Sequence, residues 1–158
     1  MTSLPINPNP QLEFDYQVGH MRPWLLVEEV ASASMLSCDS SHVVNLIDDG
    51  SIDAAIDIRR PGVERRCIRI LRDSAFRFLH DRKGTPTNLE ERINFYLAST
   101  RIVYASHEIA SHLRCSEDHV LNLKNELSLD ISSAGSQRSY PRTSRKQLIE
   151  FIIKRRIQ

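Results

Sequence analysis

Residues 38–53 read CDSSHVVNLIDDGSID, and residues 115–130 read CSEDHVLNLKNELSLD. The two stretches are identical at seven of sixteen positions, whereas unrelated segments of average composition share about one. Upstream, residues 29–32 (EVAS) match residues 108–111 (EIAS) once two additional residues near position 34 are allowed in the first copy. The spacing of about 75 residues is longer than that of solenoid repeats. The chain therefore contains one small unit in two copies.

Each copy carries the pattern of two short helices joined by a tight turn, which is a helix-turn-helix. In the second copy Ser106 is the expected N-cap of a helix that ends at Leu113, and Ser116 is the expected N-cap of the next helix. In the first copy the corresponding cap is Asp39, and Gly50 is expected to end the helix in a left-handed conformation. The residues expected to face inward are Val43, Leu46 and Ile47 in the first copy and Ile109, Ala110, Leu113, Val120 and Leu123 in the second.

A β-hairpin and a closing helix follow each pair of helices. In the first copy, apolar residues at positions 52, 54, 56 and 58 alternate as in a strand, residues 59–62 (RRPG) favour a turn, and residues 67–70 form the expected returning strand. The second hairpin, from Leu129 to Arg142, is shorter. The expected closing helices are about 73–83 and 145–156, with Ala75, Phe76 and Leu79 inward in one and Leu148, Phe151 and Ile152 inward in the other.

The two copies are connected by a predicted linker helix. Thr87 and Glu90 have the spacing of a capping box, and Leu89, Ile93, Tyr96 and Leu97 form an apolar stripe on a helix that continues to about Ile102. We therefore expect a mainly α fold with small β-hairpin wings. Its expected parts are a flexible arm (1–24), a first domain (25–83), the linker helix (84–103) and a second domain (104–158).

Composition excludes several classes of protein. The 158 residues are 41% hydrophobic and 26% charged, which is typical of a globular chain rather than a disordered one. Three widely spaced cysteines do not form a disulfide framework, so we expect a reducing, cytoplasmic location. No secretory signal and no apolar run long enough to span a bilayer is visible. The chain also lacks a Ser/His/Asp pattern and a glycine-rich phosphate loop, so no enzyme and no cofactor is expected.

The basic residues are unevenly placed. The formal net charge is only +1, but 17 of the 21 basic residues are arginines, whose flat guanidinium forks suit phosphates and guanine edges. Residues 25–57 contain seven acids and no Lys or Arg, whereas residues 58–83 contain nine basic residues and three acids. A solvated surface with uneven charge is the alternative explanation of this pattern.

The order of these elements resembles the excisionase-like winged helix-turn-helix domains related to the MerR family. Residues 108–123 carry the resemblance in the second copy, through Glu108-Ile109-Ala110, Leu113, Cys115-Ser116, Val120 and Leu123. In the first copy it rests on residues 43–50, 68–72 and 78–79. The resemblance implies that the second helix of each copy enters the DNA major groove and that the hairpin wing touches a minor groove or the backbone. At the exposed start of that helix, where members often carry Arg or Lys, this chain has Ser40 and Ser41 in one copy and Glu117 and Asp118 in the other.

Candidate DNA-binding residues follow from these positions. Asn45 and Asn122 occupy equivalent places on the exposed helix faces and suit contact with adenine, although a solvated surface asparagine is the alternative. The two Cys-x3-His pairs are better explained by a core cysteine and an exposed histidine than by a zinc site, so no metal is expected. The full expected set is Ser40, Ser41, His42, Asn45, Arg59, Arg60, Arg65, Arg66, Arg69, His119, Asn122, Lys124, Arg138 and Arg142.

The sequence thus predicts a binder of double-stranded DNA, either a transcriptional regulator or an excisionase-type recombination factor of a bacterium, phage or mobile element. Further expected partners are a second copy of the chain and a recombinase or transcription protein, but neither a membrane nor a small molecule. The expected location is the cytoplasm, on the nucleoid when DNA is bound. The rival hypothesis is a protein-interaction module on a degenerate helix-turn-helix scaffold, in which the apolar linker stripe joins subunits.

Overall fold

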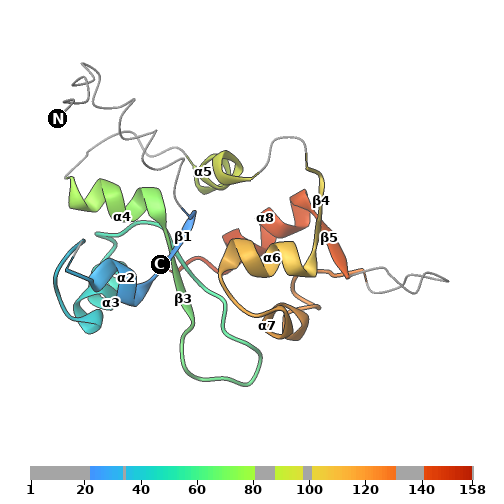
Figure 1. The fold of residues 1–158 in the computed structure, drawn as a ribbon, viewed down its shortest axis with the longest axis horizontal. Helices are drawn as coiled ribbons and strands as arrows, with labels where there is room; N and C mark the ends of the chain where they lie inside the picture. The colour runs from blue at the N-terminus through green and yellow to red at the C-terminus, as the bar shows by residue number, and fades with distance from the viewer. Residues whose placement is uncertain (1–21, 34, 81–87, 98–100, 131–140, 158) are drawn as a thin grey trace, which may run out of the picture.

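The structure is a computed structural model that describes residues 22–33, 35–80, 88–97, 101–130 and 141–157. Within these ranges it is a mixed fold of helices and small antiparallel sheets (Figure 1). The first half contains β1 (Trp24–Leu26), α2 (Val27–Ala31), α3 (Ser40–Asp48), β2 (Ala55–Asp57), β3 (Ile68–Leu71) and α4 (Arg72–Leu79). After α5 (Leu89–Tyr96), the second half contains β4 (Val103–Ala105), α6 (Ser106–Leu113), α7 (Glu117–Asn122), β5 (Arg142–Ser144) and α8 (Arg145–Lys154).

The first strand of each half runs directly into a helix, and the same contact stabilises both junctions. The Glu29 carboxylate accepts the backbone N–H of Leu26 at 2.8 Å. The Glu108 carboxylate accepts the N–H of Ala105 at 3.1 Å. Each glutamate lies in the first turn, where an acid stabilises the positive end of the helix dipole. Helix α6 begins at Ser106, and its N-cap is Ala105. The predicted cap, Ser106, is therefore displaced by one residue.

The turn between the first two helices is also repeated. The N–H of Cys38 donates to the Ala31 carbonyl, and the N–H of Cys115 donates to the Ala110 carbonyl, both at 3.0 Å. The residue before each cysteine is left-handed, with φ of 49° in the first half and 57° in the second. The first turn spans two residues more than the second, as the sequence predicts. The sequence repeat is therefore accompanied by a repeat of backbone geometry.

The β-hairpin of the first half lies between the two halves. β3 pairs with both β1 and β2 in an antiparallel sheet. Ala54, Ile56 and Ile58 are buried in a cluster with the apolar residues of α5, α6, α7 and α8, whereas Ala55 and Ile70 belong to a second cluster with α2 and α3. Successive side chains of a strand point to opposite faces, so this hairpin contributes to both cores.

The C-terminal residues extend the same sheet. Asp57 donates its backbone N–H to Arg155 at 2.9 Å, and Ile157 donates to Ala55 at 2.8 Å. The chain end therefore returns to the middle of the molecule, where it lies beside β2 (Figure 1). The two halves are packed against each other through a shared core rather than through a linker alone.

Some expectations about the helices are wrong. The predicted linker helix continues to Ile102, but α5 ends at Tyr96 because Leu97 is extended, with ψ of 141°. Its N-cap is Asn88, which accepts the Glu91 N–H at 2.8 Å, while Thr87 lies outside the described residues. In α4 only Ala75 of the expected inward residues is buried, and Leu79 is 38% exposed, because this helix buries its polar first turn instead.

The other expected inward residues are buried as predicted, in α3, α6, α8 and the region of α7. Residues 1–21 of the predicted arm and the second hairpin tip, including Arg138, lie outside the described residues. The predicted end of the arm is wrong, because Trp24 begins β1 and is fully buried. No helix in the described part of the chain is long and apolar enough to cross a membrane.

Candidate nucleic-acid interface

Helix α3 presents a polar face to solvent and an apolar face to the first-half core. Asp39 occupies the N-cap position, although its side chain accepts no hydrogen bond there. Gly50 follows the helix with φ of 84°, as expected for a left-handed stop. The exposed face contains Asp48 and four predicted site residues, Ser40, Ser41, His42 and Asn45. All four are therefore placed where an external partner can reach them.

Residues 58–67 connect β2 with β3 and form what we call the basic loop. Its base is closed by the Asp57 carboxylate, which accepts the N–H groups of Arg59 and Cys67, both at 3.0 Å. At its tip, the N–H of residue 63 donates to the Arg60 carbonyl at 3.2 Å, and Gly62 has φ of 79°. A proline followed by a left-handed glycine is the geometry of a type II turn. The arginines are thus held on an ordered hairpin end.

The four exposed arginines of the basic loop differ in their partners. Arg59 lies 3.2 Å from the Asp57 carboxylate, and Arg66 lies 3.0 Å from Asp48 at the end of α3. Arg60 and Arg65 make no ion pair within the described part of the chain. The Arg66–Asp48 pair joins the loop to α3, while the other two guanidinium groups stay open to solvent.

A groove of about 730 Å³ lies between the start of α3 and the basic loop. Figure 1 shows this loop between α3 and α7. Eight of the predicted site residues line the groove: Ser40, Ser41, Arg59, Arg60, Arg65, Arg66, Arg69 and His119. Residues that are 20 or so positions apart in sequence are therefore brought to one surface by the hairpin.

Two of these residues, Arg69 and His119, also join the halves. Arg69 lies on the face of β3 opposite Ile68 and Ile70, and its guanidinium donates to the carbonyls of Leu113 at 2.9 Å and Arg114 at 2.8 Å. The His119 Nε2 atom lies 2.5 Å from the Ile58 carbonyl oxygen. Both side chains contact backbone carbonyl groups of the other half. The proposed interface therefore does not include Arg69 or His119.

The remaining candidates of the second half are dispersed. Asn122 is exposed, and its amide donates to the Asp118 carbonyl at 2.8 Å within α7. Lys124 and Arg142 are exposed on separate elements. At the start of α7, the Glu117 carboxylate accepts the Ser106 hydroxyl at 2.7 Å. The described residues of this half therefore offer no counterpart of the groove beside α3.

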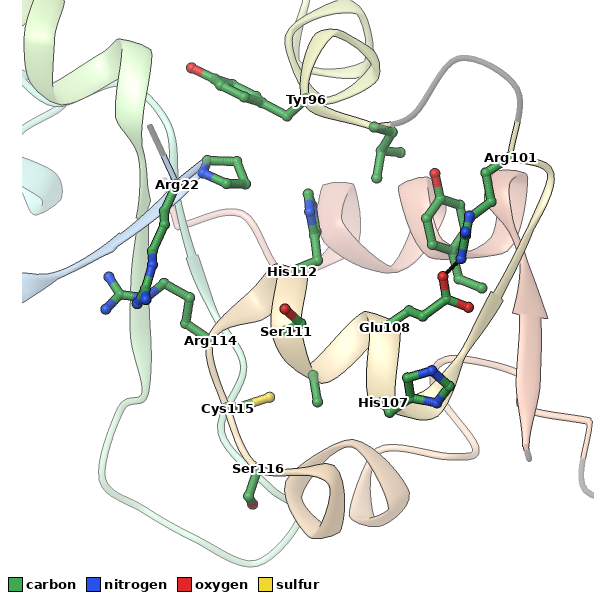
Figure 2. A pocket seen from close by; sticks show the side chains of 14 residues that line it. Arg22, Tyr96, Arg101, His107, Glu108, Ser111, His112, Arg114, Cys115 and Ser116 are labelled. Carbon is green, nitrogen blue, oxygen red and sulfur yellow. Dashed lines mark ion pairs between the residues drawn. The ribbon is translucent and has the colours of Figure 1, made fainter. Parts of the chain in front are cut away.

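Contacts between the halves also involve residues that the sequence did not single out. Trp24 donates its indole N–H to His112 Nε2 at 3.1 Å, and Arg114 forms an ion pair with Glu29. Figure 2 shows His112 and Arg114 at the end of α6, on the wall of a hollow of about 1020 Å³. Burial lowers the pKa of His112 to about 4. The single tryptophan of the chain, a large side chain that is usually well buried, was the one residue in the sequence that could have indicated this contact between the halves.

A buried ionic cluster attaches α5 to the first half. Arg92 is 5% exposed, and its guanidinium donates to the carboxylates of Asp73 and Asp53 at 2.8 to 3.1 Å. Burial favours the neutral form of Asp53, but hydrogen bonds from Arg92 and Ser74 outweigh it and lower the pKa of this carboxyl. Within the described residues, no group of three or more His, Cys, Asp or Glu is placed to hold a metal ion.

No family model matches the chain, and neither a curated protein nor a solved structure was found to be similar to it.

Proposed function

We propose that this protein binds double-stranded DNA, with α3 in the major groove and the basic loop beside it on the backbone or in the minor groove. The observation that carries the proposal is the placement of Arg60 and Arg65. Both are exposed, make no ion pair in the described part of the chain, and face the polar side of α3 across one groove. Arginines bind phosphates, while serine and asparagine side chains contact base edges.

The proposed architecture is a pair of winged helix-turn-helix units. The repeated order of strand, two helices, strand and closing helix supports it, as does the left-handed residue in each inter-helix turn. In this architecture the basic loop is the wing of the first unit. A transcriptional regulator and an excisionase-type recombination factor are the two roles that such a protein would fill.

We further propose that only the first unit reads bases. Helix α7 begins with Glu117 and Asp118, both exposed, which would face the phosphates of a duplex. His119, the next residue, is engaged with the Ile58 carbonyl. The second unit then acts as a support that holds the basic loop against α7 and keeps its arginines directed outward.

The test is a binding assay with a random duplex library at about 50 and 200 mM salt, because phosphate contacts make affinity depend steeply on salt. The double variant Arg60→Ala/Arg65→Ala should bind every duplex more weakly, and its log–log salt slope should be flatter by about 0.9 for each lost phosphate contact. The matched control is Lys154→Ala, which removes an exposed charge that does not line the groove and should leave the slope unchanged.

A protein-interaction module is the second candidate. The exposed acids that begin α7 favour it, since acids disfavour DNA, and Val44 and Val63 line the same groove as the arginines. The sequence predicted that the apolar stripe of the linker helix joins subunits in such a module. Leu89, Ile93 and Leu97 of this stripe are instead buried in the shared core. If the parent protein fails to bind any duplex at the lower salt concentration, the DNA proposal is wrong and this candidate replaces it.

A further inference from the structure

An apolar groove lies between α5 and α8, on elements that do not line the proposed DNA surface. Its volume is about 530 Å³, and Ile102, Ile149 and Ile153 line it. Ile102 is 74% exposed and Ile153 is 40% exposed, which is unusual for side chains of this size. Adjacent apolar residues that are open to water are typical of interaction sites rather than of scattered surface side chains.

The rim of the groove carries charges of both signs. Glu90 on α5 and Glu150 on α8 are exposed, and so is Lys146, one turn before Glu150. None of these three forms an ion pair within the described residues. Arg145 also lines the rim, but its guanidinium is engaged with the Asn94 side chain at 2.9 to 3.0 Å. Because the Asn94 amide is neutral, Arg145 keeps its positive charge, and the rim therefore carries two bases and two acids around an apolar centre.

We infer that this groove is the interface between two copies of the chain related by a two-fold axis. In such an interface the same patch meets itself, so a surface that carries both a base and an acid can oppose the two across the axis. A nucleic acid would be repelled by Glu90 and Glu150, and a purely acidic or basic partner would meet a like charge. A second copy satisfies the apolar centre and the mixed rim together.

The patch is small, so the dimer should be weak and depend on protein concentration. Sedimentation equilibrium of the full chain from about 1 to 200 μM should show a monomer–dimer equilibrium with a dissociation constant in the micromolar range. Ile102→Lys and Ile153→Lys should each raise that constant tenfold or more, because each places a charge in the apolar centre. Leu79→Lys is the matched control, since Leu79 is an exposed apolar residue of α4 outside this groove.

A charge exchange tests the two-fold arrangement separately from folding. Lys146→Glu and Glu150→Lys should each weaken the homodimer through like charges, and a mixture of the two variants should associate more tightly than either alone. Circular dichroism melts verify that each variant is folded. A parent chain that stays monomeric throughout the concentration range overturns the inference, as does a dimer that tolerates both isoleucine substitutions. Because this experiment contains no DNA, its outcome is independent of the proposed function.

Discussion

The indole N–H of Trp24 donates to Nε2 of His112 at 3.1 Å, between residues 88 positions apart in the chain. Trp24 begins β1 in the first half, and His112 lies in the last turn of α6 in the second. Because the indole can only donate, Nε2 must be the unprotonated nitrogen, and the imidazole is neutral. Protonation of His112 would remove this acceptor and place a charge in the buried junction between the halves.

The first prediction is a loss of stability in mild acid. Burial lowers the pKa of His112 from 6.5 to about 4, so between these values the unfolded chain binds a proton that the folded chain does not. The free energy of unfolding should therefore decrease as the pH decreases. His112 alone should lower it by about 2 kcal/mol between pH 7.5 and pH 5. Urea unfolding followed by fluorescence of the sole tryptophan measures the change directly.

Two histidine variants serve as its controls. His112→Gln retains a hydrogen-bond acceptor without a titrating ring, so its stability should be nearly independent of pH across this interval. His42→Gln removes an exposed imidazole from α3 and should keep the pH dependence of the parent. A pH dependence that survives in His112→Gln would assign the effect to other groups.

The second prediction concerns the buried cluster around Arg92. Arg92→Ala leaves the Asp53 and Asp73 carboxylates without their shared partner, and breaking a buried ionic network from one side costs about 3–5 kcal/mol. Arg66→Ala removes an exposed pair with Asp48 and should cost about 1 kcal/mol or less. Chemical unfolding of both variants provides the comparison, and equal losses would contradict the structural role given to Arg92.

The third prediction separates the two equivalent asparagines and depends on the proposed DNA binding. Asn45→Ala should cost about 1–3 kcal/mol at a specific site and little on non-specific DNA, since an asparagine–adenine contact has this value. Asn122→Ala should leave affinity unchanged, because its amide donates to the Asp118 carbonyl on the half that we propose does not read bases. Selected duplexes and a scrambled duplex, titrated side by side, give both numbers. Equal losses would show that both halves read DNA.

The fourth prediction concerns thiol reactivity. Burial raises the pKa of the Cys115 thiol to about 11 from 9.0, and the neighbouring Arg69 offsets only part of the rise. Because the thiolate is the reacting form, alkylation of Cys115 at pH 8 should be slowed about a hundredfold relative to the same thiol in urea. Mass spectrometry of iodoacetamide adducts over time resolves the site. Rapid labelling of Cys115 in the folded chain would indicate that the junction opens readily.

The sequence by itself determined the repeated local structure. The apolar spacing in residues 43–47 and 109–123 predicted which helix faces are buried, and Gly50 and Ser116 predicted helix ends that the structure confirms. These features depend on hydrogen bonds and side-chain contacts within about one or two helical turns, which is the range over which spacing along the chain carries information. The two extra residues in the first turn were predicted from the alignment of the two copies.

Only the tertiary structure decided how the halves share the hairpin. The sequence predicted Arg69 and His119 as DNA-binding residues, but β3 directs Arg69 to the carbonyls at the end of α6, and α7 directs His119 to Ile58. It also gave no indication that Arg92 lies between two aspartates. Which face of a strand is covered depends on the apolar area that is buried between segments far apart in the chain. The spacing of residues within one segment gives no information about this buried area. The two halves therefore repeat in sequence but differ in packing. The first half has an open polar surface beside α3, and the second half packs against the hairpin of the first.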